Sequence, residues 1–376
     1  MKGKRIIGVL GDVGGKNAAL PPLELALNAG CDVLLLLAGT CRTLHRGGKL
    51  AFDPRFLVHE VGSAPAEYAH LRQPHHLVVL GASQSVEGST VAAGVAILAQ
   101  APVVAIQDMY GSSVPTLKVL QREGCLGRIA CVCVTDEFSR QHLLSQGLEI
   151  FQDRVPVTGG PQFDKVIEIQ KTWAPRRARI RGTLAPHDLL VLIAGQLNGT
   201  TEMLALVDAA SLKLGLPNNL HVVLRRHPRS TELDQWLTNA CLGRTGPRLR
   251  FYDVPQEYAP TNEDLLPGVD IVMSGYSTTN LYGVLYEIPG VVYVGTPSFR
   301  WDLWREKRLE KPPEVKAGAA WYVETSGELV HVITELQRGD ASTDVSRLKE
   351  AQRRIAQHND GHATDRVWAQ MRNLLA

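Results

Sequence analysis

The sequence lacks several features that would place it at once in a common class of protein. Only six of its 376 residues are cysteines, and no two of them form a CxxC pair. Cys131 and Cys133 lie inside an apolar run, so we expect them in a buried strand. No apolar stretch approaches the roughly 18–20 residues of a membrane span, and the run Ile6–Leu10 is too short for a signal peptide. A reduced, cytoplasmic location fits best.

The sequence also lacks an excess of charge of one sign, since its formal net charge is only +2. The most basic segment is 176–181, and no aromatic residues are interleaved with it for stacking on bases. We interpret it as a solvated connector and expect no nucleic-acid partner. A homodimer is compatible with the composition.

The common nucleotide-binding fingerprints are absent from the Gly-rich segment 8–17, which follows the first apolar run. The GxGxxG pattern fails, and a P-loop would require glycine at Leu10 and serine or threonine at Asn17. The segment is therefore either a tight turn between a strand and a helix or a loop that lets a substrate approach the backbone. In the second case, Asp12 and Lys16 would contact an acceptor.

What the sequence does contain is a regular alternation of strand-like and helix-like segments, which is typical of a doubly wound parallel sheet. Gly and Pro interrupt the alternation near 157–161, and it restarts after an Arg-rich segment. We therefore predict an α/β protein with two Rossmann-like domains that face a cleft, and a C-terminal helix. The predicted domains are 1–160, for the acceptor, and 183–376, for a nucleotide donor, with a hinge at 161–182.

The strongest motif in the second half is 270–280, an apolar strand that ends in small and hydroxyl residues before a helix. A helix start of this kind offers free backbone N–H groups to an anion. An ordinary N-cap needs one such residue, whereas Ser277, Thr278, Thr279 and Asn280 stand in succession. We interpret the motif as a site for the diphosphate of a sugar nucleotide.

Other donor contacts are expected in the loops after the neighbouring strands, because ligands of such folds bind at the carboxyl ends of the strands. Arginine suits phosphate through its planar fork, and histidine supplies a proton or a hydrogen bond. Late in the following helix, a glutamate could bind a ribose or simply face solvent. The predicted contacts are Gly195, Gln196, Arg225, Arg226, His227 and Glu287.

In the first half, Asp108 stands where a strand ends in the expected cleft. A carboxylate there could remove the proton of an acceptor hydroxyl, or it could cap the next turn. The aromatic and basic segment 300–305 is either an acceptor surface or a packed amphipathic helix.

Together these motifs resemble the GT-B superfamily of nucleotide-sugar enzymes. The turn 275–278 is similar to the Asp-Tyr-Ser-Ser turn of CDP-glycerol glycerophosphotransferases. The segment 158–161 resembles the Thr-Gly-Asn-Pro hinge of non-hydrolysing UDP-N-acetylglucosamine 2-epimerases. Both branches carry a basic or His-Pro segment like 226–228 and an Asp-Gly-x-Ala ending like 360–363.

The departures from these patterns bear on the activity. Gly275 stands where the glycerophosphotransferase turn has an acid, and Ala82 stands where the epimerase has a catalytic Asp. At best, Gln107 or Asp108 replaces a second epimerase carboxylate. The resemblance therefore implies group transfer rather than reversible proton chemistry at a sugar carbon.

We accordingly expect a glycosyltransferase-like enzyme that uses a UDP- or CDP-linked donor and a small-molecule or glycan acceptor. The catalytic residues would be Asp108, His227 and Asp12. We expect no metal or further cofactor, because helix dipoles and basic side chains can neutralise the leaving diphosphate. The alternatives are an epimerase-like or sugar-nucleotide-hydrolysing enzyme and a non-catalytic, two-lobed ligand-binding protein.

Overall fold

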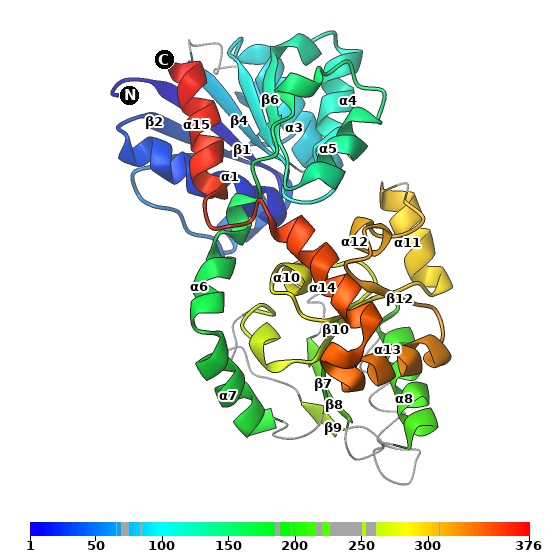
Figure 1. Cartoon of the computed structure of the whole chain (residues 1–376). Coiled ribbons are helices and arrows are strands. Elements are labelled where there is room, and N and C mark those ends of the chain that lie inside the picture. Colours follow the sequence, from blue (N-terminus) through cyan, green and yellow to red (C-terminus); the bar gives the residue numbers. More distant parts are fainter. Residues whose placement is uncertain are drawn as a thin grey trace. The chain divides into compact units, whose positions relative to one another are not determined.

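The chain forms two compact units, seen here in a computed structural model (Figure 1). Unit 1 comprises Met1–Ile167 together with His358–Ala376, and unit 2 comprises Glu168–Gln357. The structure describes residues 1–64, 66–68, 75–82, 85–184, 189–196, 198–215, 220–225, 250–252, 261–307 and 309–376.

Unit 1 is built on a parallel sheet that has six strands in its described part, in the order β3-β2-β1-β4-β5-β6. The strands are β1 (Arg5–Leu10), β2 (Asp32–Leu37), β3 (Leu57–Glu60), β4 (Leu77–Gly81), β5 (Val103–Ile106) and β6 (Ile129–Cys133). The helices are α1 (Val13–Asn28), α2 (Gly39–Arg46), α3 (Val86–Leu98), α4 (Val114–Arg122), α5 (Glu137–Leu144) and α15 (Ala363–Leu375).

Both faces of this sheet are buried, as the continuous apolar runs predict. Along β1, Ile6 and Leu10 point into one hydrophobic core, and Ile7 and Val9 point into the other. This alternation follows from the two-residue period of a strand. Helices α1 and α15 cover the first face, and α3 and α4 contribute to the core on the second (Figure 1).

Unit 2 repeats the arrangement, with six described strands in the order β12-β11-β10-β7-β8-β9, all paired in parallel. The strands are β7 (Leu189–Ala194), β8 (Leu220–Arg225), β9 (Arg250–Tyr252), β10 (Ile271–Ser274), β11 (Gly290–Val294) and β12 (Trp321–Val323). The helices are α7 (Trp173–Leu184), α8 (Thr200–Leu214), α10 (Thr278–Leu285), α11 (Pro297–Lys307), α12 (Pro313–Lys316), α13 (Ser326–Arg338) and α14 (Thr343–Ala356). The expected α/β class with two Rossmann-like sheets is confirmed.

The division of the chain differs from the expected one at its C-terminal end. We predicted that 183–376 forms the second domain, whereas the last helix, α15, belongs to unit 1. The reason is burial, because Val367, Met371 and Leu375 of α15 lie in the core beside α1 and β1. Their spacing of four residues gives the helix one apolar face, which the first sheet covers.

The expected hinge 161–182 is mostly helical. It contains α6 (Lys165–Lys171), across which the boundary between the units falls, and α7, which packs on unit 2. The basic segment 176–181 lies in α7 and is not a solvated connector. Arg177 and Arg181 both pair with the Asp270 carboxylate, and a Cβ on Gly268 would lie 2.2 Å from Ile180. These contacts fix α7 to the start of β10.

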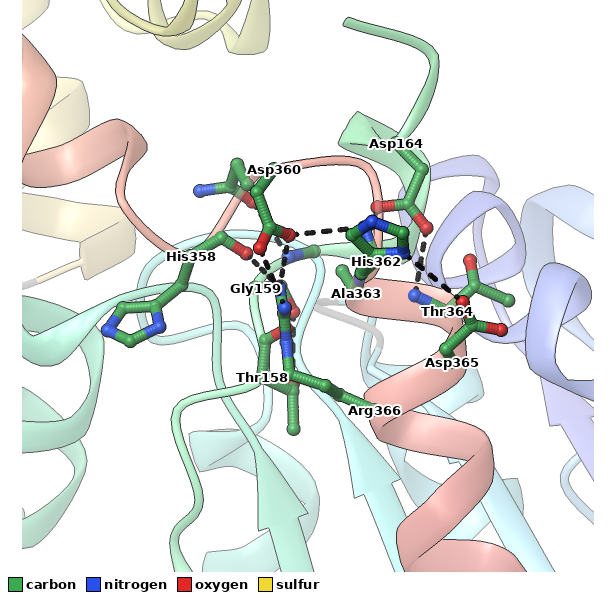
Figure 2. A network of polar contacts seen from close by, with 12 residues as sticks. Thr158, Gly159, Asp164, His358, Asp360, His362, Ala363, Thr364, Asp365 and Arg366 are labelled. Carbon is green, nitrogen blue, oxygen red and sulfur yellow. Dashed lines mark hydrogen bonds and ion pairs between the residues drawn. The ribbon is translucent and has the colours of Figure 1, made fainter. Parts of the chain in front are cut away.

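Within unit 1, the segment before α6 is tied to the segment before α15 by a network of polar contacts (Figure 2). The Asp164 carboxylate accepts hydrogen bonds from the backbone N–H groups of Ala363, at 2.9 Å, and Thr364, at 2.8 Å. It therefore satisfies two of the N–H groups that begin α15. The Arg366 guanidinium donates to the Thr158 carbonyl at 2.8 Å and also to the His358 carbonyl.

Gly159 makes this approach of the two segments sterically feasible. Its φ is +77°, and a Cβ at this position would lie 1.9 Å from the His358 carbonyl oxygen. Glycine alone combines this backbone conformation with the absence of a side chain. The Gly-Gly sequence that marks the hinge motif is thus required by packing inside unit 1.

The contribution of Asp360 to the stability of this network should depend on pH. Hydrogen bonds from Arg366 and from the His362 backbone lower the pKa of Asp360 from 3.8 to about 2. Because the folded pKa lies below the unfolded one, the contribution to stability is present above about pH 4 and is lost as pH falls through about 2. We expect Asp360→Asn to lower the free energy of unfolding at pH 6 by about 0.5 kcal/mol or less, since the side chain is 47% exposed and solvent screens it.

Urea denaturation between pH 6 and pH 2 measures this difference. The matched control is Asp340→Asn, whose carboxylate is 99% exposed. A gap between Asp360→Asn and the parent that stays constant down to pH 2 would contradict the assignment.

Candidate functional site

The candidate site in unit 1 lies at the carboxyl ends of β1 and β4, where the strand order reverses direction. Open α/β sheets bind ligands at this position. The backbones are crowded there, because a Cβ on Gly15 would lie 2.1 Å from the Ala82 carbonyl oxygen and one on Gly81 would lie 2.5 Å from the Gly15 carbonyl oxygen. The Gly-rich loop thus lets α1 begin directly against the end of β4.

Asp12 has a clear structural role at this point. It is the N-cap of α1, and its Oδ1 atom accepts a hydrogen bond from the Gly15 backbone N–H at 2.9 Å. An N-cap carboxylate satisfies one of the first free N–H groups of the helix. The expected acceptor contact of Asp12 stays a prediction.

Asp108 follows β5 and is 7% exposed. Its carboxylate lies against the first turn of α1, since a Cβ on Gly14 would lie 1.9 Å from Asp108 Oδ2 and 3.7 Å from Asp12 Oδ1. The structure therefore brings together the two carboxylates that we predicted from separate loops. The first turn of a helix carries partial positive charge, so the start of α1 attracts an anionic group placed there.

Further polar groups surround Asp108. Gln162, from the segment that precedes α6, donates from Nε2 to the Asp108 carbonyl oxygen at 2.6 Å. Ser113 donates to Gln107 Oε1 at 2.8 Å. Gln107 Nε2 and Ser112 Oγ are buried and have no hydrogen-bond partner among the described residues. Buried polar atoms are usually satisfied, so these two atoms at the end of a strand are exceptions that retain unused hydrogen-bonding capacity.

Two aromatic rings complete this edge of unit 1 and were not singled out from the sequence. The His142 ring, on α5, stacks on the Tyr110 ring with a centroid distance of 4.1 Å. Gly111, with φ +72°, leaves room for His142, because a Cβ there would lie 3.1 Å from His142 Nε2. In the sequence, Tyr110 and His142 are 32 residues apart, and only the adjacency of β5 and β6 joins them.

The candidate site in unit 2 lies at the corresponding reversal, between β7 and β10. Gly195 and Gln196 follow β7 as predicted. The Gly195 N–H donates to the Arg225 carbonyl at 2.8 Å, and the Gln196 N–H donates to Thr200 Oγ1 at 3.1 Å. These bonds hold the loop against the end of β8 and the start of α8.

The four polar residues that begin α10 have separate roles. Ser277 is the N-cap, and its hydroxyl accepts from the Thr279 N–H at 3.2 Å. Thr279 is 3% exposed and accepts from Asn262 Nδ2 at 3.0 Å, and Asn280 is fully buried and donates to the Val292 carbonyl at 2.8 Å. Thr278 is exposed. The side chain of Asn280 therefore holds β11, and Ser277 and Thr278 are the members of the group nearest to solvent.

Phe299 of α11 explains why a glycine occupies position 275. A Cβ on Gly275 would lie 2.1 Å from the Phe299 ring, and one on Gly199 would lie 2.7 Å from it. The ring thus packs on the turns before α8 and α10, and an acid at position 275 would collide with it. The departure from the glycerophosphotransferase turn has a steric cause in this chain.

Two buried hydroxyl groups lie at the ends of neighbouring strands beside these turns. Ser274, the last residue of β10, is fully buried, and Thr296, shortly after β11, is 8% exposed. Ser274 Oγ and Thr296 Oγ1 have no hydrogen-bond partner in the described part of the chain. Like Gln107 and Ser112 in unit 1, these hydroxyls retain unused hydrogen-bonding capacity at the ends of strands.

The remaining residues that we predicted to contact the donor have different positions in the structure. Arg225 ends β8 and donates from Nη2 to the Thr261 carbonyl at 3.3 Å. Arg226 and His227 lie outside the described residues. Glu287 is not brought near Ser277. It follows the far end of α10, and at 1.5 Å per helical residue this end lies about 12 Å from Ser277. The Glu287 Oε2 atom accepts a hydrogen bond from Arg353 at 3.0 Å. The ion pair with Arg353 gives Glu287 a structural role at the amino edge of the sheet.

No group of three or more His, Cys, Asp or Glu side chains in the described part of the chain is arranged to hold a metal ion. None of the described helices is both long and apolar enough to cross a bilayer.

Comparison with known proteins places the fold. No protein-family model matches the sequence, and no curated protein matches it. Solved structures match over nearly the whole chain. A putative UDP-N-acetylglucosamine 2-epimerase from Listeria monocytogenes is 12% identical, with a TM-score of 0.64, and the match covers 99% of this chain and 96% of that one.

Two further structures represent a sugar-nucleotide epimerase and a glycosyltransferase. The UDP-GlcNAc 2-epimerase from Neisseria meningitidis, bound to UDP-GlcNAc, is 14% identical with a TM-score of 0.61, and the match covers 99% of this chain and 100% of that one. CalG4, the calicheamicin glycosyltransferase, is 13% identical with a TM-score of 0.57, and the match covers 99% of each chain. The chain thus has the GT-B fold that the sequence indicated, at an identity that establishes the fold alone.

The start of α10 yields a test of which polar residues are structural. We expect Asn280→Ala to lower the free energy of unfolding by about 1–3 kcal/mol, because it removes a buried hydrogen-bond donor from the Val292 carbonyl. Thr278→Ala changes an exposed side chain, and we expect an effect within about 0.5 kcal/mol. Urea denaturation of both variants measures the two values. Equal losses would contradict the separation of roles.

Proposed function

We propose that this protein transfers a group from a nucleotide-activated donor, UDP- or CDP-linked, to an acceptor hydroxyl or amine. The observation that carries the proposal is the position of Asp108, whose buried carboxylate lies at the strand-end site of unit 1 against the start of α1. Its role there is that of the general base. The fold, shared with sugar-nucleotide epimerases and a glycosyltransferase, supports the class of donor.

In the proposed reaction, the acceptor oxygen or nitrogen attacks the carbon or phosphorus atom that is bonded to the donor's leaving group. As the new bond forms, Asp108 takes the acceptor proton, and the bond to the leaving nucleotide breaks. The base must be ionised before it accepts a proton.

Unit 2 is the proposed donor domain. The first backbone N–H groups of α10 face the edge where β10 and β11 end, and a helix start of this kind stabilises a phosphate. The exposed hydroxyl of Thr278 would supply a further hydrogen bond. Arg225, with the sequence-predicted Arg226 and His227, would neutralise the charge that develops on the departing nucleotide.

The second candidate function is epimerisation or hydrolysis of a sugar nucleotide. The similarity to two UDP-N-acetylglucosamine 2-epimerases supports it as directly as it supports transfer. Against it stands Ala82, which follows β4 at the position where the epimerase pattern has a catalytic Asp. Incubating the protein with UDP-N-acetylglucosamine alone separates the cases, since a strict transferase leaves this compound unchanged. A third candidate, a two-lobed binding protein without catalysis, would consume no donor with any acceptor.

The general-base assignment predicts the behaviour of Asp108→Asn. Asparagine is similar in size but cannot accept the proton, so we expect transfer to fall by about 10²–10⁴-fold. Binding of UDP should be unchanged, as measured by the rise in the thermal unfolding midpoint that a ligand of the native state produces. Asp340→Asn, at a 99% exposed carboxylate, is the matched control.

Asp12→Asn separates capping from contact with the acceptor. Asparagine is as good an N-cap as aspartate, so the variant keeps the start of α1. A raised KM for the acceptor with unchanged stability would support the acceptor contact that we predicted from the sequence.

If Asp108→Asn transfers at the parent rate, the general-base assignment is wrong.

A further inference from the structure

An open cavity of unit 1 lies at the amino edge of the sheet, opposite to the edge that carries Asp12 and Asp108. Its volume is about 410 Å³, and it is lined by 100–102, before β5, by 127–130, around the start of β6, and by Arg154. Cavities of about 300–1,000 Å³ are the usual sites of small-molecule ligands. We call it the amino-edge cavity.

Two irregularities of the backbone shape the amino-edge cavity. The pairing of β5 with β6 shifts register beside Val103 and Val104, which oppose Ile129 and Cys131, so Ala130 is an extra residue in β6. Gln100, in the connection to β5, has a φ of +51°, which residues other than glycine seldom adopt. Extra strand residues and strained conformations both recur beside functional sites.

Two arginine side chains line the cavity, and backbone carbonyls hold both of them in place. Arg128 donates from Nη1 to the Ala96 carbonyl at 3.2 Å and to the Ile97 carbonyl, near the end of α3. Arg154 donates from Nη1 to the Ile129 carbonyl at 3.2 Å. In the described part of the chain, no group accepts from Nε or Nη2 of either arginine. Both guanidinium groups are thus oriented and keep free donors.

The charge of these two arginines is not balanced by acidic side chains. No carboxylate lines the cavity, and neither Arg128 nor Arg154 forms an ion pair with a described residue. The carbonyls that end α3 offset only about half of one charge. Other arginines of unit 1 do pair with carboxylates, namely Arg42, Arg46, Arg55, Arg122, Arg140 and Arg366. The cavity therefore has an excess of positive charge.

This excess selects the class of ligand. Two guanidinium groups match a phosphate, which carries about −1.5 to −2 charges at pH 7 and has three acceptor oxygens. Arginine binds such a group through two parallel N–H bonds. A single carboxylate would leave one guanidinium unmatched. Because the lining contains no aromatic ring on which a base could stack, the rest of the ligand should be small and polar.

An anionic membrane surface is the other anion to consider, because Phe151 is 71% exposed and its ring lies 5.7 Å from the Arg154 guanidinium. Lipid-binding segments carry clusters of about 4–8 Lys and Arg on an open surface. The amino-edge cavity has two arginines, and they line a recess. These observations favour a small ligand.

We propose that the amino-edge cavity is an anion site that binds the phosphate group of a small polar compound through Arg128 and Arg154. The inference goes beyond the proposed function and does not rest on it. Strand β5 begins at the cavity and ends just before Asp108, so the two sites lie at opposite ends of one strand.

Isothermal titration calorimetry of the full chain tests the proposal with inorganic phosphate, glycerol 3-phosphate and glucose 6-phosphate. We expect at least one of them to bind, and we expect Arg128→Gln/Arg154→Gln to weaken that binding by at least tenfold. Arg128→Lys/Arg154→Lys keeps the charge without the planar fork and should restore part of the affinity. Equal affinities for the three probes would mean that free phosphate suffices, and tighter binding of an ester would mean that its body also contributes.

Gly127→Asp tests the same site without removing an arginine, so it decides the question if the double variant does not fold. Gly127 lines the cavity, and a Cβ there would have no heavy atom within 4 Å. The new carboxylate should compete with phosphate for the guanidinium groups and weaken binding by at least tenfold. The thermal unfolding midpoint should not fall. The matched control is Arg122→Gln, which removes a 74% exposed arginine of unit 1 and should bind the probes like the parent.

The proposal is overturned if none of the three probes binds. It is also overturned if a folded Arg128→Gln/Arg154→Gln variant or Gly127→Asp binds them with parent affinity, because the probe would then lie elsewhere, as at the start of α10. Arginine-dependent binding only to vesicles of phosphatidylcholine and phosphatidylglycerol in equal parts would make the cavity part of a membrane contact and would likewise overturn it.

Discussion

Parallel hydrogen bonding between the strands is the constraint on which the rest of the structure depends. A parallel strand can follow its neighbour only through a crossover, so the carboxyl ends of the paired strands in each unit lie at a single edge of the sheet. The loops at that edge must share a small space, and glycine is needed wherever two backbones or a backbone and a ring meet, as at Gly15 and Gly275. The polar side chains that can take part in chemistry lie in the loops at this carboxyl edge. The crossover connections leave from this edge and return the chain to the opposite, amino edge before each new strand.

This constraint also explains why so much could be predicted from the sequence. Apolar runs identify the strands, and the residues just after them identify the edge, which is how Asp12 and Asp108 were found without knowledge that both lie beside Gly14. The location of α15 could not be found in that way. Its spacing of Val367, Met371 and Leu375 shows that one face is buried, but either sheet could cover such a face.

The candidate site was less predictable, because one kind of residue serves several physical roles. Ser277, Thr278, Thr279 and Asn280 look alike in the sequence, yet one caps a helix, one is exposed and two are buried in hydrogen bonds. Glu287 is on the expected helix but at its far end. The tryptophans of α11 show the reverse case, since Trp301 and Trp304 are exposed where aromatic composition favours a packed helix.

The assignment of α15 to unit 1 has a consequence for how the chain is made. Unit 2 lies between two parts of unit 1 in the sequence, so the ribosome completes all of unit 2 before it makes the last helix of unit 1. Until Leu375 has left the exit tunnel, the apolar face beside α1 and β1 lacks its final cover. The unit synthesised first is therefore the one completed last, and during elongation its exposed core face is a point where chaperones or neighbouring nascent chains can bind.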